Sequence, residues 1–551
     1  MNTIERQKEE QRNIFIAMVL VIAVLFSFQF FTKQNGVAPA GAPVPAAAPV
    51  SQPQPAVLPA DKNTLLPTVP VWDVKTIPVK NAVLAGAMSN QGGQVADLAL
   101  RKYRETPQKD SPHVVLLNQD YTVGVAWTGA GMPGTTEAWT VSGSELTPET
   151  PVILTYQTPA VKIERTVSLD DAYMMTLSDR VINLTDAPVA GTLTGQITRA
   201  ESAAASKMSP VFEGFVGYFN NQLFEESYAS VGKESFSKAA AGGWTGITDK
   251  YWQTILIPPA EAVTMTYQKS GDKHIAGFQT NSLTIPARQS IEKTTRVFMG
   301  AKEVSVIDRY RESLNIARFD LTIDYGWYYF LTKPFLAFLA FLFKIFGNMG
   351  VAILIFATLL RIAMLPIATK SYESMAKMRQ IQPKIKALQE RYKDNKMLLQ
   401  QEMMALYKRD KVNPMAGCLP MLIQIPIFFA LYKVLSVSIL MRQAPFFGWI
   451  KDLSQPDPTS LWTAFGLFPW NEPAFLHLGV WPILMGITMY VQQKMQPQPT
   501  DPTQANVMKF LPLIFTFMMA NFASGLVIYW TWSNILSIAQ QKYIMKKMKV
   551  E

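Results

Sequence analysis

Long apolar runs interrupt the sequence and predict helices that cross a membrane. The bilayer core requires roughly 20 apolar residues per helix. Four such runs cover residues 14–31, 350–367, 418–440 and 476–492, and a fifth, 510–541, has no charged residue. A single helix of that last length would measure about 48 Å, more than a bilayer core of about 30 Å. Because Ala523-Ser524-Gly525 lies near its middle, we expect two short spans in a hairpin there, and therefore six spans in all.

The charge pattern predicts the orientation of these spans, because cytoplasmic segments of membrane proteins carry an excess of Lys and Arg. Residues 368–411 contain eleven Lys/Arg and five Asp/Glu, and residues 542–551 contain four Lys and one Glu. These segments therefore carry net charges of +6 and +3, which together make up most of the chain's +10. Six spans place both segments and both termini in the cytoplasm, and place the long stretch after the first span outside.

Two stretches allow a second interpretation. Residues 14–31 are entered by basic residues and followed by a small-residue site at 38–40, so a cleaved signal peptide is the alternative to a retained anchor. The length of the run and the proline within that site favour the anchor. Residues 327–346 are rich in aromatics but contain two lysines and a proline. As a span, this stretch would place both basic segments outside, so we expect an amphipathic helix in the membrane interface.

The part outside the membrane begins with a tether and continues as a β-domain. Residues 37–60 hold seven Pro and eight Ala, which favours an extended linker. Further on, apolar and polar residues alternate at period two, as in 152–156, 161–167 and 173–177, and turn residues separate these stretches. This pattern is typical of half-buried antiparallel strands and predicts a β-sandwich. A closing helix is indicated by the spacing of Val304, Ile307, Tyr310 and Leu314.

The expected fold is a polytopic α-helical membrane protein with six spans, plus an all-β sandwich outside the membrane. The parts are the N-terminal segment with its anchor (1–33), the Pro/Ala-rich tether (34–67), the β-sandwich with its closing helix (68–320), the interfacial helix (321–348), the second span (349–367), the cytoplasmic helical hairpin (368–411), the third span (412–440), an outer loop (441–475), the fourth span (476–494), a cytoplasmic loop (495–507), the fifth and sixth spans (508–541) and a basic tail (542–551).

The composition excludes several classes of function. One cysteine, Cys418, rules out a disulfide framework and a cysteine zinc cluster, and three scattered histidines, His113, His274 and His477, argue against a histidine metal site. The Gly-Lys pair at 232–233 lacks the spacing of a P-loop. No nucleophile–base set stands out in the β-domain, so we expect a scaffold or docking surface there, with a sugar- or peptide-binding cleft as an unsupported alternative. We therefore expect no cofactor and no enzymatic activity.

One charge lies inside a predicted span. Arg361 is about six residues, or roughly 9 Å, from the cytoplasmic end of its span, where a charge is costly unless it faces water or a partner. No Asp or Glu occurs in any of the six spans, so an ion pair between spans and a carboxylate proton relay are both excluded. The arginine therefore either snorkels to the interface or faces a wet groove. Polar and aromatic residues at similar depth that would line this groove, or else make ordinary packing contacts, are Thr358, Gln424, Tyr529, Trp530, Ser533 and Asn534.

The basic cytoplasmic segment predicts a helical hairpin with a turn at 393–395. One helical face carries Met375, Met378, Ile385, Leu388 and Tyr392, another carries Lys377, Lys384 and Arg391, and the apolar pattern resumes at Met397, Met404 and Tyr407. Ordinary packing with a solvated basic face is one interpretation. The other is a docking surface, because methionine suits varied apolar partners and a basic stripe suits lipid phosphates or ribosomal RNA.

Together, these segments resemble the YidC insertase family. The motifs that carry the resemblance are RIAMLP (361–366), SMAKM (374–378), QEMMALY (401–407), VNP (412–414) through Pro420, LIQIPIF (422–428), RQAPF (442–446), PILMG (482–486) and SGLVIY (524–529). The match is dense over residues 320–541. The anchor and the outer domain resemble the Gram-negative form of the family.

The resemblance implies a membrane protein insertase and chaperone of the bacterial inner membrane, acting alone or with the Sec translocon and without nucleotide hydrolysis. Family members enclose a hydrophilic groove that is open to cytoplasm and lipid and closed toward the outside. Arg361 would attract acidic or polar parts of the translocated tail of a nascent membrane protein. The hairpin would receive substrates and contact ribosomes or targeting factors, beside membrane lipids.

The resemblance also assigns positions along the groove. Gln424, Pro426 and Phe428 would lie in the second core helix, and Tyr529-Trp530 would be the aromatic pair of the fifth, where relatives often have two tyrosines. The groove threonine of many relatives stands four residues before the arginine, which is Ala357 here, so Thr358 would be its substitute.

Two functions of other classes stay open from the sequence. A secondary transporter or channel would need inverted repeats or intramembrane carboxylates, and we find neither in the sequence. A structural subunit of a membrane complex would do its work through the outer domain.

Overall fold

The structure is a computed structural model that describes residues 75–548, apart from 136, 202–210, 327, 394, 411, 413–418, 465–466, 469–472, 474–476 and 497–501. The expected first span and the tether, as well as Cys418, lie outside the described residues. The chain divides into two compact units. The β-unit comprises Met1–Arg104 and His113–Thr322, and the helical unit comprises Glu105–Pro112 and Ile323–Glu551.

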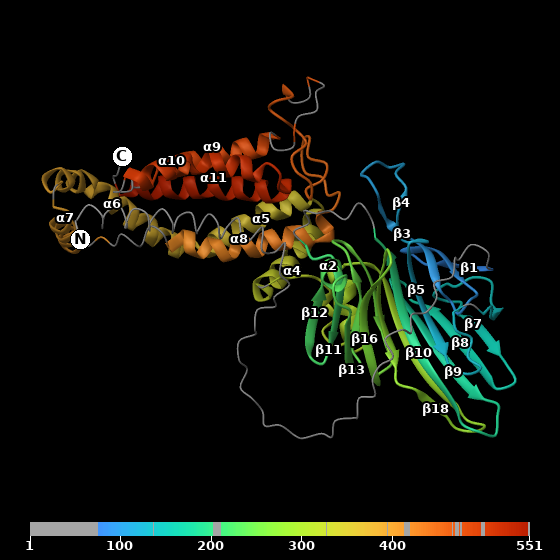
Figure 1. Cartoon of the computed structure of the whole chain (residues 1–551). Helices are drawn as coiled ribbons and strands as arrows, with labels where there is room; N and C mark the ends of the chain where they lie inside the picture. The colour runs from blue at the N-terminus through green and yellow to red at the C-terminus, as the bar shows by residue number, and fades with distance from the viewer. Residues whose placement is uncertain are drawn as a thin grey trace. The chain divides into compact units, whose positions relative to one another are not determined.

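The β-unit is a sandwich of two antiparallel sheets, as the alternating pattern predicts (Figure 1). Among the described residues, the first sheet contains β1 (Thr76–Lys80), β2 (Leu84–Ser89), β3 (Val95–Arg104), β4 (His113–Leu117), β5 (Tyr121–Thr128), β10 (Val189–Ala200), β13 (Phe236–Ala241), β16 (Ala262–Ser270), β17 (Lys273–Thr280) and β18 (Leu283–Ile285). Its order is β1-β2-β3-β5-β10-β17-β16-β13, with β4 on β3 and β18 on β10.

The second sheet has the order β12-β11-β14-β15-β19-β9-β8-β7-β6. Its strands are β6 (Thr140–Ser142), β7 (Val152–Gln157), β8 (Val161–Leu169), β9 (Met174–Asn183), β11 (Gly214–Phe219), β12 (Gln222–Glu226), β14 (Trp244–Thr248), β15 (Trp252–Ile257) and β19 (Ser290–Ala301). The alternation is clearest in β8, where every second residue is buried. Two short helices complete the unit, α2 (Tyr228–Val231) and α3 (Val304–Ser313), followed by the 3-10 turn η2 (Phe319–Thr322).

A buried ion pair crosses the interior of this sandwich. Arg165 of β8 takes an inward position and is fully buried, and its Nε lies 2.6 Å from Oδ1 of Asp179 in β9. Its Nη1 donates to the carbonyl of Val125 in β5 at 2.6 Å, and Trp127 Nε1 donates to Asp179 at 2.8 Å. A buried charge is tolerated only when it is paired and hydrogen-bonded. The pair therefore fixes the two sheets to each other at one register.

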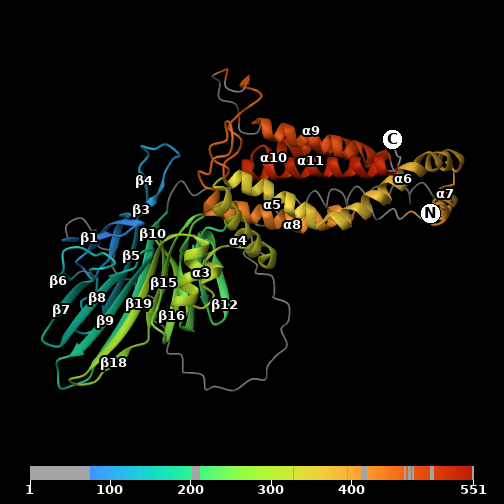
Figure 2. The same cartoon turned by 180° about the vertical axis from the view of Figure 1, so that it is seen from behind.

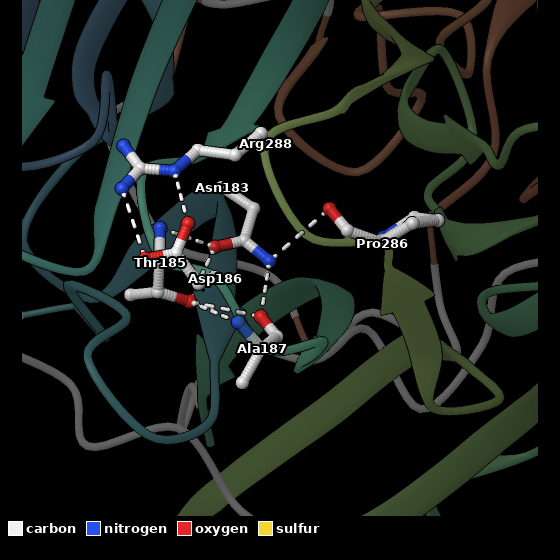
Figure 3. A network of polar contacts seen from close by, with 6 residues as sticks. All are labelled: Asn183, Thr185, Asp186, Ala187, Pro286 and Arg288. Carbon is white, nitrogen blue, oxygen red and sulfur yellow. Dashed lines mark hydrogen bonds and ion pairs between the residues drawn. The ribbon is translucent and has the colours of Figure 1, made fainter.

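A polar network pins two turns of the β-unit together (Figure 3). Asn183 Nδ2 donates to the carbonyls of Ala187 at 2.8 Å and Pro286 at 3.2 Å, while its Oδ1 accepts from the backbone N–H of Thr185 at 2.9 Å. Arg288 pairs with Asp186 beside it at 2.9 Å. One buried amide thus replaces the backbone partners that these turns lack.

In the helical unit, α5, α8, α9, α10 and α11 lie side by side in both views (Figures 1 and 2). The bounds of its described helices are α4 (Tyr329–Phe346), α5 (Met349–Ala363), α6 (Leu365–Arg391), α7 (Lys396–Arg409), α8 (Leu419–Val437), α9 (Val480–Lys494), α10 (Pro502–Met519) and α11 (Ser524–Lys547), with the 3-10 turn η4 (Ile439–Met441) after α8. The last apolar run is divided between two helices, because α10 ends at Met519 and α11 begins at Ser524. That each of them crosses the membrane stays a prediction.

The second predicted span ends earlier than its sequence suggests. The helix breaks at Met364, and α5 and α6 meet at an angle of 67°. Pro366 stands in the first turn of α6, where its missing N–H has no intrahelical partner to lose. The last residues of the expected span therefore already belong to the helix that continues into the hairpin.

Helix length alone does not establish the expected number of spans. Among the described residues, α4 is long and apolar enough to cross a membrane, and the bent pair α5 and α6 passes if counted as one broken span. Shorter apolar helices cover Gln424–Val437 and Val507–Met519. The interfacial position of α4 stays a prediction, because its composition also suits a span.

Candidate functional site

Arg361 lies in the last turn of α5 and is half-buried. Its Nη2 donates a hydrogen bond of 2.6 Å to the hydroxyl of Tyr372 in α6. Its Nε is buried and has no hydrogen-bond partner among the described residues. Because a guanidinium has five N–H donors and always carries its charge, this contact leaves part of its donor capacity unused.

The bend between α5 and α6 makes this contact possible. In a straight helix, residues eleven positions apart are separated by about 16 Å along the axis, beyond comfortable side-chain reach. The break at Met364 folds α6 back toward the arginine. Tyr372 is itself held in a buried cluster with Ala368, Met375 and Ile544, the last from α11. Two helices thus position the ring that contacts Arg361.

Thr358 is one turn from Arg361 and faces α11. Its Oγ1 donates to the carbonyl of Leu354 at 2.8 Å and accepts from Nε1 of Trp532 at 3.0 Å. Ala357, four residues before the arginine, is buried and adds no polar group. Thr358 therefore joins α5 to α11 through its described hydrogen bonds, neither of which involves Arg361.

Helices α8 and α11 share a polar and an aromatic contact. Gln424 Nε2 donates to the Tyr529 hydroxyl at 3.0 Å, and Tyr529 is buried. Four residues further along α8 and one further along α11, the ring centres of Phe428 and Trp530 are 4.7 Å apart. Pro426 stands between the two contacts inside α8, where it cannot donate the helical hydrogen bond.

Of the remaining predicted groove residues, Ser533 hydrogen-bonds through its side chain to Tyr529, whereas Asn534 contacts α9. Asn534 Nδ2 donates to Thr488 Oγ1 of α9 at 3.2 Å, and the carbonyl of Ser533 accepts from Ser537 Oγ at 2.7 Å. Gln424 and Ser533 therefore meet at the Tyr529 hydroxyl, and Arg361 is close enough to Tyr529 to interact with it electrostatically. Thr358 and Asn534 instead make separate contacts between helices. Sequence reasoning missed Tyr372, Trp532 and Thr488, since their partners are distant in the chain and no local pattern marks them.

Buried polar atoms without partners occur toward the C-terminal ends of α5 and α11. Gln540 Nε2 donates to Thr369 Oγ1 at 3.5 Å, and Gln541 Nε2 donates to the Met495 carbonyl at 2.9 Å. The Oε1 atoms of both glutamines are buried and, like Arg361 Nε, bond to nothing among the described residues. Such atoms are costly in an apolar environment unless water or a polar chain reaches them.

The loop between α8 and α9 hydrogen-bonds to the helices at the opposite end of the bundle. Asp457 is 1% exposed, and its carboxylate accepts from Trp449 Nε1 at 3.0 Å and from the backbone N–H of Trp481, in the first turn of α9, at 2.9 Å. In the same loop, the carbonyls of Gln455 and Leu453 accept from the first N–H groups of α11, at 2.7 and 3.0 Å. Donors at two helix N-termini are thereby satisfied by one loop.

Close packing completes this end. A Cβ on Gly350, at the start of α5, would lie 2.0 Å from a ring atom of Phe446, so the Phe446 ring rests directly on that glycine. Gly525, in the first turn of α11, is similarly covered by Met441. Only glycine fits these positions without displacing the loop.

The helices of the predicted hairpin pack partly through the expected residues, since Met378, Ile385, Leu388 and Tyr407 belong to the hairpin core. Its core consists of Ile381, Ile385, Leu406 and Val412, with Met378, Leu388, Met403 and Tyr407 against it. Met375 instead packs on Ile544 of α11. Met397 and Met404 are exposed, so the expectation that they continue the packed face is wrong. The helical phase after the break places Met403 inward.

The basic stripe of the hairpin lies on the surface. Lys377, Lys384 and Arg391 are exposed, and Lys384 lies 2.9 Å from the carboxylate of Asp410. Met404 is exposed on α7, so an apolar side chain and basic side chains are both accessible on this hairpin.

Lys433 is a second charge within an apolar helix, and it is paired. Its Nζ bonds to the carboxylate of Asp324, which precedes α4, and both side chains are largely buried. The Lys433 stem packs against Gly326, whose φ of +68° favours glycine. The ion partner that the predicted spans lack is thus supplied by the segment that leads into α4.

Hollows in the β-unit are lined by small or neutral residues. One of about 530 Å³ is bordered by Thr128, Gly131, Ala160, Pro188 and Ser282. Within the described residues, no group of three or more His, Cys, Asp or Glu is arranged to hold a metal ion. A sugar- or peptide-binding cleft therefore gains no support from these side chains.

Comparisons with known proteins cover nearly the whole chain. The profile of the family described as 60Kd inner membrane protein matches residues 341–551, and that described as YidC periplasmic domain matches residues 76–338. The Membrane protein insertase YidC of Agrobacterium fabrum is 42% identical over 98% of this chain and 96% of its own length, and that of Rhizobium meliloti is 41% identical over 98% and 97%. A solved active YidC insertase with its first transmembrane domain resolved covers 85% of this chain and 93% of its own, at 18% identity and a TM-score of 0.36.

Proposed function

Because this chain belongs to the YidC family of membrane protein insertases, we propose that it inserts nascent membrane proteins by holding their polar tails beside Arg361. The protein is a bacterial inner membrane insertase with a periplasmic domain. The finer proposal concerns the path that a substrate takes through the helical unit.

The half-buried Arg361 with an unused buried donor carries this proposal. Helices α5, α8, α9, α10 and α11 contain no Asp or Glu, so the bundle itself offers this cation no carboxylate. An acidic side chain on an incoming tail would supply both the missing charge and the missing acceptor. A charge-assisted hydrogen bond of this kind is roughly twice as strong as a neutral one.

The arrangement of the two ends supports entry from the cytoplasmic side. Arg361 Nε and the unpartnered Oε1 atoms of Gln540 and Gln541 lie toward the C-terminal ends of α5 and α11, whereas the opposite ends of α9 and α11 are capped by the α8–α9 loop. A tail that enters beside Gln540 and Gln541 meets hydrogen-bonding groups in place of lipid. This contact lowers the cost of moving backbone polar groups out of water.

The apolar segment of the substrate would follow the outside of α8 and α11. Phe428, Pro426 and Trp530 present aromatic and apolar surface there, next to the polar pair of Gln424 and Tyr529. Burial of the substrate helix in lipid supplies the driving force. The protein then lowers a barrier without covalent chemistry, so the proposed mechanism uses no cofactor.

The hairpin formed by α6 and α7 would bind the ribosomes or targeting factors that deliver substrates. Six spans would place it in the cytoplasm with both termini. Its exposed Lys377, Lys384 and Arg391 suit ribosomal RNA or lipid phosphates, and Met404 suits an apolar partner such as a targeting factor. Met375 and Met378 would act by holding the hairpin in place, since both pack inside the helical unit. The Sec translocon would be a further partner for some substrates.

Site-specific crosslinking to stalled nascent chains tests the path. A photo-crosslinker at Gln424 or Trp530 should capture an inserting chain, while one at the exposed Phe517 of α10 serves as the matched lipid-facing control. Arg361→Ala should reduce insertion of acidic-tailed substrates severalfold, and Arg361→Lys should restore part of it. Equal capture at Phe517, or unchanged insertion by Arg361→Ala for every substrate, would contradict the proposed path.

A further inference from the structure

The loop between α8 and α9 turns large apolar side chains outward. Phe447 is 64% exposed, Leu461 is 45% exposed, and Trp449 and Trp462 are each 43% exposed. We propose that these four residues form an outer-leaflet foot, which inserts at the level of the phospholipid headgroups. This inference rests on the proposed topology, in which the loop lies on the periplasmic side.

The loop that carries the foot has one buried side and one exposed side, so the exposure of the foot is not due to loose packing. Ile450 and Leu453 point inward and are buried, while their neighbours Phe447 and Trp449 stay exposed. Trp449 is also fixed by its Nε1, which donates to the buried carboxylate of Asp457 at 3.0 Å. A tryptophan with a satisfied N–H and an exposed ring suits the membrane interface, where one end is polar and the other apolar.

The direction of the loop matches a membrane surface. Its ends join the apolar helices α8 and α9, and both views show it leaving the end of the bundle sideways instead of continuing along the helix axes (Figures 1 and 2). If the bundle spans the membrane, a segment that runs sideways at its end lies along the leaflet. A segment that continued along the axes would instead project into water.

The charges on the loop fit phospholipid better than a protein surface of either sign. Lys451 is exposed beside Trp449, whereas the carboxylate of Asp457 is buried and that of Asp452 accepts from Ser454 at 2.7 Å. The described part of the loop therefore shows a cation next to the aromatic rings of the foot, while the carboxylates of Asp452 and Asp457 are engaged within the loop and by α9. Phosphate groups above and acyl chains below would satisfy both kinds of side chain.

Such a foot would set the depth of the helices near Arg361. The loop caps α9 and α11 and packs on α5, so its height in the leaflet is transmitted to the bundle. Holding the outer ends at the headgroup level would keep the polar atoms near Gln540 at a fixed distance from the inner surface.

Depth-dependent quenching tests the proposal in the full-length chain. With Cys418→Ser as the background, a fluorophore is attached to Phe447→Cys, Trp462→Cys or, as a water-exposed control, Glu149→Cys in the β-unit. The protein is reconstituted in vesicles of phosphatidylethanolamine and phosphatidylglycerol that contain a lipid spin-labelled near its headgroup. We expect the labelled lipid to quench the probes at 447 and 462 at least twofold more than the probe at 149.

Each other outcome has a defined meaning. Quenching of the probes at 447 and 462 by iodide, with no quenching by the labelled lipid, would overturn the foot, as would burial of these probes only when another membrane protein is present. Protection of position 462 from an impermeant thiol reagent added outside, with lipid quenching retained, would instead contradict the topology. Trp462→Glu should weaken quenching at 447, and Trp462→Phe should preserve it.

Discussion

The guanidinium of Arg361 and the hydroxyl of Tyr372 are joined by a hydrogen bond of 2.6 Å across the bend between α5 and α6. Tyr372 accepts this bond while its ring is buried against α11. The arginine that would meet the substrate is therefore oriented by α6, the helix that leads into the hairpin. Any movement of α6 would change where the positive charge lies.

Tyr372→Phe tests this dependence, because it removes the acceptor and keeps the ring. Loss of the bond should cost about 1 kcal/mol of positioning, or roughly a fivefold loss of insertion for acidic-tailed substrates. Insertion into vesicles measures the effect, with a neutral-tailed substrate expected to change little. Tyr407→Phe, in the hairpin core, is the matched control. Equal losses for both variants, or for both substrates, would contradict a positioning role.

The ion pair between Lys433 and Asp324 should fix α4 to α8. Asp324→Asn leaves a largely buried ammonium without its partner, which we expect to cost about 1–3 kcal/mol of stability. Exchange of the two residues, Asp324→Lys with Lys433→Asp, should restore much of this loss. Thermal unfolding in nanodiscs measures both, and Asp186→Asn, in the exposed pair with Arg288, should have little effect. A double variant no more stable than the single one would refute the pairing.

Asp457 should hold the first turn of α9 in place. Asp457→Ala removes the acceptor of Trp449 Nε1 and of the Trp481 backbone N–H, and should cost about 1–3 kcal/mol. Hydrogen exchange at the start of α9 should become faster, while α4 stays protected. Asp452→Ala, whose carboxylate bonds only within its own turn, is expected to have a smaller effect on α9. Unchanged exchange at Trp481 after Asp457→Ala would exclude this role.

The stability of the β-unit should depend on pH through His274. Burial lowers the pKa of this imidazole, and Lys269 and Arg199 lower it further, while Glu201 opposes them. The ring stacks on Tyr228 at 4.3 Å between centroids. Because the folded pKa lies below the unfolded value of about 6.5, the unfolded chain takes up the proton first as the pH falls. Stability is therefore fully present above about pH 6.5 and is lost as the pH falls toward the folded pKa.

Hydrogen exchange of β17 in the full chain, compared between pH 7.5 and 5.5 after correction for intrinsic rates, measures this loss. His274→Gln should remove the additional opening at pH 5.5, whereas His113→Gln should leave it. Persistence of the full pH effect in His274→Gln would assign it to another group.

Local patterns in the sequence predict most of the secondary structure. The alternation at 152–156 and 161–167 becomes β7 and β8, because one face of each strand is buried at period two. The small residues at 523–525 mark the turn before α11 for a similar reason, since a charge-free run too long for one helix must break. Such features depend only on neighbours in the chain.

These local patterns could not predict contacts between residues that are distant in the sequence. Arg165 occupies an apolar-inward position of β8, and only the register with β9 shows that Asp179 pairs with it. The bond between Thr358 and Trp532 joins residues 174 positions apart. The Met403 and Met404 pair shows a third limit, because the helical phase after a turn is set by the packing of the hairpin.

The loop between α8 and α9 accepts hydrogen bonds from the first amides of α9 and α11, and it would also block the end of the bundle to a passing polypeptide. On the proposed path, a polypeptide that advanced between these helices from the cytoplasm would meet this loop, and passing through it would require the loop's hydrogen bonds to α9 and α11 to break. Sideways departure into the surrounding lipid needs no such rupture. The loop that caps two helices would thereby direct the substrate to leave the bundle laterally, into the lipid.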